Sequence, residues 1–416
     1  MAERLVIIGA GMAAGRLVER LCVDHAGAYE ITLFNAEPRG TYNRIMLSPV
    51  LSGEKTYAEI VTHDDAWYAA HGVTCRFGEK VTGIDTDAKT VTGDNGTVAY
   101  DRLVIATGSA PFIIPLPGSD LNGVIAYRDL EDTDMMIQAA ANPGARAVVI
   151  GGGLLGLEAA AGLASRGMEV TVVHLMGHLM ERQLDEAAGF LLRKALIDRG
   201  IKVICGANSH EILGHDGRVC ALVLEDGRKL PCDLLVMAVG IRPNTGVAKD
   251  AGIAVARGIP VNDQMQTATP DVYALGECVE HNGALFGLVA PLYDQAEVLA
   301  THLTGGQAAF APKEVSTKLK VTGCDLFSAG DFAGGEGRED ITLRDPEGGN
   351  YKRLVLENSR LVGAVMYGDT ADSNWFYGLI RSGADVSNMR EQLLFGPSHE
   401  GAIPLEPYGG RCSLTG

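Results

Sequence analysis

The sequence lacks closely spaced cysteines. It holds eight cysteines, and no two of them form C-x-x-C or C-x-x-x-x-C. This spacing excludes a thioredoxin-like or disulfide-reductase redox pair, a short-spaced zinc site and a ferredoxin-type iron–sulfur cluster. We therefore expect no metal site, and reduced, mostly structural thiols in a reducing compartment.

Positive charge and long hydrophobic runs are also scarce. The chain has 35 Lys and Arg against 52 Asp and Glu, a formal net charge of −17. Nucleic acid and anionic membranes would repel it, so we expect neither as a partner. Uncharged apolar runs are too short to span a bilayer. The run Leu5–Ala14 imitates a signal peptide, but its glycines favour a strand and turn. We expect a cytoplasmic protein.

Glycine, in contrast, is abundant, and it follows a pattern in two segments. Each segment joins an apolar strand to an apolar helix through a glycine turn. Such glycines let the backbone approach a pyrophosphate, which lies at the helix N-terminus. Two turns of this kind predict two dinucleotides, and therefore a flavin (FAD) fed by a nicotinamide, NAD(P)H. The turn positions are Gly9, Gly11 and Ala14 in the first segment, and Gly151, Gly153 and Gly156 in the second.

The strand and helix patterns predict an α/β fold with two Rossmann-like domains and a small C-terminal α+β domain. Prolines at 111–117 and at 243 mark crossings between the first two. We expect an FAD-binding domain over 1–117 and 245–305, an NAD(P)-binding domain over 118–244, and the α+β domain over 306–416. Expected strands are 4–9, 30–34, 73–77, 89–98, 103–106, 147–150, 169–174, 201–205, 218–224, 234–239, 351–357 and 360–366; expected helices are 12–24, 64–71, 154–166, 186–199, 290–303 and 373–381; 35–48 is expected to be a polar loop.

An acidic residue near the end of the second strand is expected to bind a ribose hydroxyl. Asn35 and Ala36 stand there, and the first acid is Glu37. The alternative for Glu37 is an exposed loop glutamate. Further along, the apolar strand that ends at Thr107-Gly108 has a counterpart in the second segment, which ends at Gly240.

The loop from Tyr42 to Ser48 resembles that of the flavoprotein pyridine-nucleotide reductases, whose motif is Y-x-R-x-x-L-S-K. The resemblance implies that Arg44 holds the adenosine–pyrophosphate end of FAD, where a guanidinium can fork onto phosphate oxygens. The family's lysine falls on Pro49, so a cation near the flavin is missing. Related enzymes that use an L-S-C loop have a cysteine at this position, and thiol-based peroxide or disulfide chemistry is therefore not expected.

Two further marks of this family follow in order. They are Thr107-Gly108 and Glu277, the latter where the family has an aspartate on the flavin ribityl chain. The resemblance also places Glu158 on the helix that faces the nicotinamide–flavin junction. There a glutamate can fix the carboxamide or pair with a cation; the alternative is a helix-surface charge.

His174 stands where NAD enzymes usually carry glutamate. A neutral imidazole can hydrogen-bond ribose hydroxyls, whereas a protonated one could attract a 2′-phosphate. Because no arginine is immediately beside it, we favour NADH over NADPH.

Several longer segments resemble the flavin–NAD(P)H part of the assimilatory nitrite reductase large subunit and the electron-transfer subunit of assimilatory nitrate reductase. The resemblance implies a diaphorase, an enzyme that passes electrons from NADH through FAD to a partner redox protein. The chain shows no cysteine clusters of the kind that follow in the nitrite reductase family. The segments are 37–44, 151–159, 178–185, 317–330, 361–369 and 393–396.

Two other functions stay open. One is an NADH-dependent reductase of a rubredoxin or ferredoxin in another pathway; the other is a redox-sensing FAD/NAD(P)H-binding protein. The C-terminal domain can be a docking face for the partner, a dimer contact or a structural cap, and a homodimer is left open.

Overall fold

The structure is a computed structural model, and it describes residues 2–312, 317–321 and 323–397. Two compact units divide the chain: Met1–Leu179 with Leu196–Lys313, and Met180–Ala195 with Glu314–Gly416. No helix in the described ranges is long and apolar enough to cross a membrane.

The first unit contains a parallel five-stranded sheet in the order β19-β7-β1-β2-β3. The last four residues of β1 and the last three of β7 are buried, as expected for strands covered on both faces. The strands are β1 (Glu3–Ile8), β2 (Tyr29–Asn35), β3 (Thr74–Phe77), β7 (Arg102–Ile105) and β19 (Val272–Ala274).

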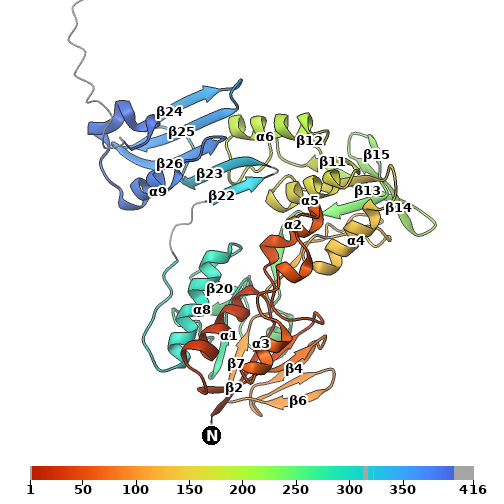
Figure 1. The fold of residues 1–416 in the computed structure, drawn as a ribbon, viewed down its shortest axis with the longest axis vertical. Coiled ribbons are helices and arrows are strands. Elements are labelled where there is room, and N and C mark those ends of the chain that lie inside the picture. Colours follow the sequence, from red (N-terminus) through yellow and green to blue (C-terminus); the bar gives the residue numbers. More distant parts are fainter. Residues whose placement is uncertain (1, 313–316, 322, 398–416) are drawn as a thin grey trace, which may run out of the picture. The chain divides into compact units, whose positions relative to one another are not determined.

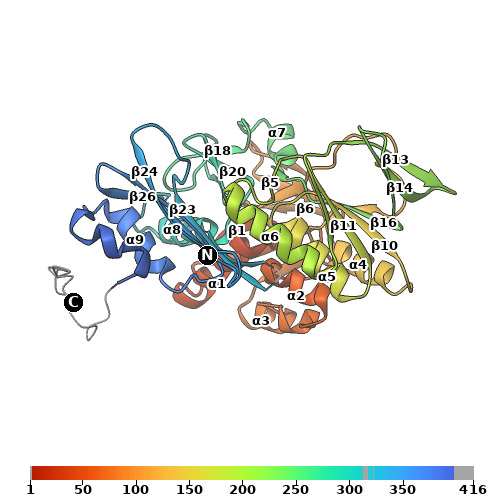
Figure 2. The same cartoon turned by 90° about the horizontal axis from the view of Figure 1, so that it is seen from above.

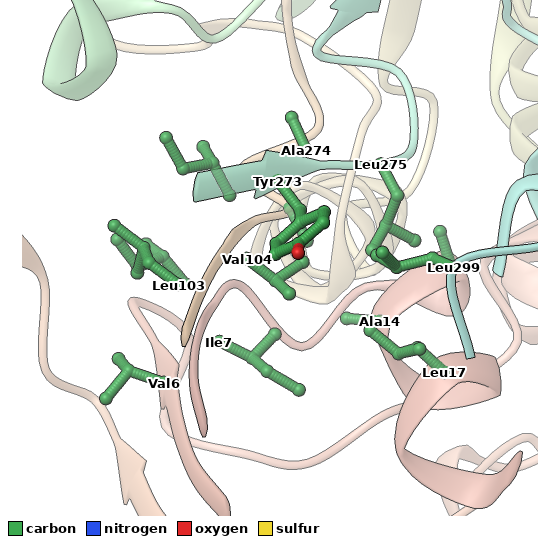
Figure 3. Close-up of a cluster of buried hydrophobic side chains, with 14 of the residues drawn as sticks. Val6, Ile7, Ala14, Leu17, Leu103, Val104, Tyr273, Ala274, Leu275 and Leu299 are labelled. Carbon is green, nitrogen blue, oxygen red and sulfur yellow. The ribbon is translucent and has the colours of Figure 1, made fainter. Parts of the chain in front are cut away.

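Helices α1 (Met12–Asp24) and α8 (Val289–Leu303) pack side by side against this sheet (Figure 1). Glu297 on α8 ties the two helices together, because its carboxylate accepts from Arg16 at 2.8 Å and pairs with Arg20 at 2.7 Å. Figure 3 shows the apolar core beneath them: side chains of the strands (Val6, Ile7, Leu103, Val104) meet those of the helices (Ala14, Leu17, Leu299) around Tyr273.

A second parallel sheet lies in the same unit, in the order β12-β11-β10-β16-β9. Helix α5 (Leu154–Ser165) follows β10 and packs against β10 and β11, as Figure 2 shows. The sheet therefore repeats the strand–turn–helix arrangement of the first. Its strands are β9 (Val124–Ile125), β10 (Arg146–Ile150), β11 (Glu169–His174), β12 (Lys202–Cys205) and β16 (Leu234–Met237).

The two predicted crossings between these sheets lie beside each other. β8 (Ser109–Pro111) and β17 (Ile241–Pro243) pair antiparallel. Just outside this pair, Asn244 donates its amide to the Thr107 carbonyl at 3.0 Å, and the Thr107 hydroxyl donates to the Asn244 carbonyl at 2.6 Å. The outgoing and returning chains are thus joined where they leave the first sheet.

Smaller elements complete the first unit. The three-stranded antiparallel sheets β4-β5-β6 and β13-β14-β15 and the sheet β18-β20-β21 lie outside the two parallel sheets. These elements are β4 (Val81–Asp85), β5 (Thr90–Gly93), β6 (Gly96–Ala99), β13 (Ser209–His215), β14 (Arg218–Leu224), β15 (Lys229–Pro231), β18 (Ile259–Val261), β20 (Val279–His281), β21 (Ala284–Leu285), α3 (Asp65–Ala70), α7 (Gly246–Asp250), η1 (Arg44–Met46) and η2 (Tyr57–Glu59).

Two local expectations were wrong, and one helix was not predicted. The single strand expected at 89–98 is the hairpin β5–β6, because the turn at 94–95 reverses the chain. The polar loop expected at 35–48 gives way to η1 and to helix α2 (Leu47–Ser52). Helix α4 (Leu130–Ala140) was not predicted, although Asp129 caps it by accepting from the Asp132 N–H at 3.0 Å.

The second unit contains an antiparallel sheet in the order β22-β23-β26-β25-β24, with α9 packed on β23 and β26. Asp185 of the 180–195 segment is held in this unit by the Tyr351 hydroxyl at 2.6 Å and by Arg353 at 3.2 Å. Helix α6 (Glu186–Asp198) belongs to this unit up to residue 195. The other elements are β22 (Thr317–Val321), β23 (Cys324–Gly330), β24 (Arg338–Asp345), β25 (Asn350–Glu357), β26 (Arg360–Tyr367), α9 (Ser373–Ser382) and η3 (Ser387–Phe395).

The predicted fold class is confirmed: two parallel α/β sheets with a C-terminal antiparallel α+β part. The boundaries at 117/118, 244/245 and 305/306 stay predictions.

Candidate functional site

The first glycine turn joins β1 to α1. Gly9 has φ +107°, and a Cβ there would lie 2.3 Å from the Ala106 carbonyl oxygen. Gly11 is the N-cap of α1, and a Cβ there would meet nothing within 4 Å. No side chain caps this helix end. Gly9 is thus required by the fold, whereas Gly11 keeps the space in front of the helix N-terminus clear.

The second turn, from β10 to α5, repeats this geometry. Gly151 has φ +122°, and a Cβ on it would lie 2.2 Å from the Ala238 carbonyl oxygen. Gly153 is the N-cap of α5 with open space before it. A Cβ on Gly156 would lie 2.1 Å from the Gly151 carbonyl oxygen, so Gly156 lets α5 pack closely on the turn. Both turns therefore leave room for a phosphate at a helix N-terminus.

A further close contact lies just after the first turn. Ala14 is fully buried, and it is the next residue, Gly15, whose Cβ would lie 2.5 Å from the Thr41 side chain. The helix therefore accepts alanine at position 14 but needs glycine at position 15. Gly15 stands directly after the motif, and its contact with Thr41 depends on the tertiary fold.

An unpartnered polar atom also fits a ligand at the first turn. Gln295 on α8 is fully buried and accepts from the Gly276 N–H at 2.8 Å, while its Nε2 has no partner in the described structure. A Cβ on Gly276 would lie 3.5 Å from Ala13 at the start of α1. This orphaned donor and the open space at Gly11 fit a polar group bound beside the first helix N-terminus.

Glu37 and Arg44 form one ion pair. Arg44 Nη2 donates to Glu37 Oε1, and the Tyr42 hydroxyl donates to Glu37 Oε2 at 2.8 Å. The Arg44 guanidinium also lies over the Tyr42 ring, 5.0 Å from its centroid. Arg44 is therefore held in place. Glu37 is not an isolated loop glutamate but the carboxylate that orients this arginine.

A second arginine–glutamate pair lies next to the first. Arg128 Nη2 donates to Glu277 Oε2, and the Ser109 hydroxyl donates to the same oxygen at 2.6 Å. The Arg128 carbonyl accepts from Arg44 Nη1 at 3.2 Å, so the two arginines are linked. The Glu277 side chain is only 14% exposed. Arg128 was not found from the sequence, because it lies in no recognisable motif.

Two glycines at strand ends adopt the left-handed region. Gly108 has φ +64° and its carbonyl accepts from Asn244 N–H at 2.9 Å; Gly240 has φ +117° and its carbonyl accepts from Phe112 N–H at 2.9 Å. Both positions open the paired connections β8 and β17. They therefore direct the chain at the carboxyl ends of the two parallel sheets, where ligands bind in such folds.

Glu158 on α5 meets two hydroxyl groups. Ser48 Oγ on α2 donates to Glu158 Oε2 at 2.8 Å and lies 3.2 Å from the hydroxyl of buried Tyr127. Burial raises the pKa of the Glu158 carboxyl, and the Ser48 hydrogen bond offsets part of that rise. The predicted cation partner is replaced by a serine hydroxyl. Ser48 stood in the recognised loop motif, but its contact with α5 required the fold.

His174 lies at the carboxyl end of β11 and is 7% exposed. Its Nδ1 accepts from the Gly152 N–H at 3.0 Å, which requires an unprotonated ring nitrogen. A Cβ on Gly152 would lie 2.6 Å from the ring, so glycine is needed there. The next two residues, Leu175 and Met176, are 62% and 48% exposed.

No disulfide joins the cysteines that the structure describes. Within the described ranges, no group of three His, Cys, Asp or Glu side chains could hold a metal ion. The site is thus built from backbone turns, two arginine–glutamate pairs and a cluster of Glu158, Ser48 and Tyr127, called the Glu158 cluster below.

Comparison with protein families gives two matches. Residues 3–299 match the pyridine nucleotide-disulphide oxidoreductase family, and residues 316–384 match the rubredoxin NAD+ reductase C-terminal domain. Among solved structures, NADH:rubredoxin oxidoreductase from Clostridium acetobutylicum is 27% identical with a TM-score of 0.80, covering 95% of this chain and 100% of that one.

Curated relatives extend the comparison. Nitrite reductase [NAD(P)H] of Bacillus subtilis is 46% identical over 95% of this chain and 49% of that protein. The assimilatory nitrate reductase electron transfer subunit of the same organism is 40% identical over 94% of this chain and 51% of that protein. The chain spans about half the length of these relatives. The chain therefore belongs to the pyridine nucleotide-disulphide oxidoreductase family and is an NAD(P)H-dependent flavin oxidoreductase.

Proposed function

We propose that the chain is a diaphorase that passes electrons from NADH through FAD to a partner redox protein in nitrate or nitrite assimilation. The observation that carries this proposal is the pair of matching glycine turns, each with open space before a helix N-terminus at Gly11 and Gly153. The two relatives named for nitrite reduction and nitrate-reductase electron transfer support the pathway.

The first turn and the two arginines would hold FAD. The N-terminus of α1 and the guanidinium of Arg44 would both face its diphosphate, with Arg128 beside them. Glu277 would accept from the ribityl hydroxyls, Glu37 from the adenosine ribose, and Thr107-Gly108 would line the flavin end. When bound, FAD would supply the step that takes hydride from a nicotinamide and releases electrons to an acceptor.

The second turn would hold the nicotinamide cofactor. Gly151, Gly153 and Gly156 would admit its diphosphate, and Gly240 would shape the opposite wall. Glu158 would orient the nicotinamide carboxamide, as a catalytic residue at the junction.

We propose NADH as the preferred donor. The His174 Nδ1 that accepts from Gly152 marks a neutral ring, so this residue offers no positive charge to a 2′-phosphate. Leu175 and Met176, which follow, are apolar.

A reductase of rubredoxin or ferredoxin is the second candidate. It is favoured by the match of residues 316–384 and by the 26% identical ferredoxin reductase of Rhodopseudomonas palustris, with a TM-score of 0.80. The two candidates share the same chemistry and differ only in the acceptor. Co-purification from the native host separates them: a nitrate or nitrite reductase component supports the first, and a rubredoxin or ferredoxin supports the second.

The test of the common function is spectroscopic and kinetic. Purified protein is expected to show flavin absorption and to oxidise NADH with ferricyanide. A protein that has no flavin and takes none up on addition of FAD contradicts the proposal. A cytoplasmic location, a homodimer and the domain boundaries given above stay proposals.

A further inference from the structure

The Glu158 cluster forms a one-way chain of hydrogen bonds. Ser48 has a single hydroxyl proton, and it points to Glu158 Oε2 at 2.8 Å. The Tyr127 hydroxyl, 3.2 Å from Ser48 Oγ, must therefore donate to Ser48 rather than accept from it. In the described structure Glu158 Oε1 has no protein partner. One carboxyl oxygen is thus fixed, and the other is available to a ligand.

Ionic partners do not hold this carboxyl in the described structure. α5 packs against α2, α4, β10, β11 and β16. α2 and β16 carry no ionisable side chain. The charged and titratable groups on the other elements belong to α4, β10 and β11. They are Glu131, Asp132 and Asp134 of α4, Arg146 of β10, which pairs with Asp233 at 3.4 Å, and Glu169 and His174 of β11, the latter accepting from the Gly152 N–H at 3.0 Å.

Close contacts between α2 and α5 fix the position of Ser48. A Cβ on Gly162 of α5 would lie 2.6 Å from the Leu51 side chain, so the helices touch at glycine. Arg166, just after α5, donates to the Leu51 carbonyl and, at 3.3 Å, to the Val50 carbonyl. Ser48 therefore cannot move away from Glu158 without breaking this packing.

We propose that Ser48 and Tyr127 are positioning residues that orient the Glu158 carboxyl through Oε2 in place of a cation, leaving Oε1 for the nicotinamide carboxamide. This inference rests on the function proposed above. Ionised Glu158 accepts the carboxamide N–H at Oε1, and a hydrogen bond from Ser48 favours that ionised form. Without Ser48, the carboxyl binds its proton more tightly and its orientation is lost.

The experiment compares Ser48→Ala, Tyr127→Phe and Ser48→Thr in the FAD-loaded protein. Ser52→Ala is the matched control, because Ser52 lies on the same helix and donates only to the Pro49 carbonyl, at 3.1 Å. Two readouts are used. The first is KM and kcat for NADH with ferricyanide across pH. The second is the infrared band of the Glu158 carboxyl across pH, measured without nicotinamide. The band is identified by subtracting the spectrum of Glu158→Gln.

Ser48→Ala is expected to raise KM for NADH about 10- to 150-fold with little change in kcat, as for loss of one hydrogen bond to a charged group. The pH at which the Glu158 band titrates should rise, because the Ser48 hydrogen bond that lowers the pKa of this carboxyl is lost. Tyr127→Phe should change KM and the titration of the Glu158 band in the same direction but by less. Ser48→Thr should restore both to the wild-type values. Because the pKa of Asp132 is raised to about 6, this residue can also contribute an inflection to the pH curves. An inflection that disappears in Asp132→Asn belongs to Asp132.

The inference is overturned if Ser48→Ala has the same KM for NADH and the same titration of the Glu158 band as the wild type and Ser52→Ala. It is also overturned if Ser48→Thr folds but does not restore these two values. Failure of the proposed function looks different. Wild-type protein would then lack flavin or dye reduction, while the infrared titration would still report whether Ser48 acts on Glu158.

Discussion

At the residue scale, Gly9 and Gly11 are two positions apart but are constrained by different things. Gly9 has a positive φ and touches the Ala106 carbonyl, whereas Gly11 has φ −71° and open space around it. An L-residue at position 11 is compatible with the backbone, so its side chain would enter only the space reserved for a ligand.

We expect Gly11→Val to fold normally but to lose FAD. The reason is that its side chain would stand where the diphosphate must approach the α1 N-terminus. The measurement is flavin absorbance per protein together with the melting temperature of the flavin-free protein. Gly9→Ala is the contrast: it should lower the melting temperature even without flavin. Full flavin occupancy in Gly11→Val would contradict the assignment of the first turn.

The donor preference also depends on single residues. We expect NADH to exceed NADPH in kcat/KM by roughly 5- to 30-fold, since 1 to 2 kcal/mol of discrimination corresponds to that ratio. Because His174 is buried and Leu175 is exposed, Leu175→Arg is the better variant to shift the ratio toward NADPH. The measurement is kcat/KM for NADH and for NADPH, in the wild type and in Leu175→Arg. A wild-type preference for NADPH would refute the hypothesis.

Sequence spacing could predict some of these residues and not others. Gly9, Gly11, Gly151 and Gly153 follow a fixed motif, because a turn between a strand and a helix dictates its own spacing. Arg128 contacts Glu277 across 149 positions of the chain. Partners that only tertiary folding brings together leave no local signal in a single sequence.

At the element scale, α2 shows why local patterns failed. It has only six residues, includes a proline and sits in a stretch rich in polar residues. Its stability comes from packing against α5 and α4 rather than from helix propensity. The long, periodic helices α1 and α8 were predicted to within one residue of their bounds, because their apolar faces repeat over three or more turns.

We expect Gly162→Ala to destabilise the protein by about 1 to 3 kcal/mol, since the new methyl would press on Leu51. Leu51→Ala restores room, so the double variant should lose less stability than the two single variants added together. Denaturant unfolding of all three measures the coupling. Additive losses would show that α2 and α5 are not in tight contact.

Helix α4 provides a pH-dependent prediction. Burial and nearby Asp129 raise the pKa of Asp132 to about 6. A carboxyl with a raised folded pKa lowers stability as pH rises from its unfolded pKa, near 4, to about 6. Asp132→Asn should therefore raise the free energy of unfolding at pH 7 by up to about 3 kcal/mol and leave it nearly unchanged at pH 4. The amide oxygen of the introduced asparagine can still accept from the Arg128 N–H, as the native carboxyl does.

Unfolding curves at both pH values test this, with Asp134→Asn as the control on the exposed face of the same helix. A stability gain that is equal at pH 4 and pH 7 would mean that Asp132 ionisation is not its cause.

At the scale of the whole molecule, the proposed function gives the chain two dinucleotide sites, and its cysteine spacing predicts no iron–sulfur centre. The eight cysteines have no iron–sulfur ligand spacing. On the proposed function, electrons taken from NADH leave the flavin for a partner redox protein. The relatives named for nitrite and nitrate reduction are about twice as long as the matched part, which fits an electron-transfer portion.

We therefore expect the chain alone to reduce ferricyanide with NADH but to produce no ammonia from nitrite. Reduction of nitrite to ammonia needs six electrons, and the eight cysteines have no spacing for an iron–sulfur cluster to deliver them. Dye reduction needs only the two proposed nucleotide sites. The assay uses purified protein with NADH and ferricyanide, then with nitrite, and finally with nitrite and a cognate reductase component. Gly11→Val, expected to lack FAD, is the negative control for dye reduction. NADH oxidation should be coupled to nitrite reduction only when the cognate reductase component is present. Stoichiometric ammonia from the chain alone would overturn this mechanism. Failure to reduce any dye would overturn the diaphorase assignment, because electrons would then not pass from the nicotinamide through the flavin to an acceptor.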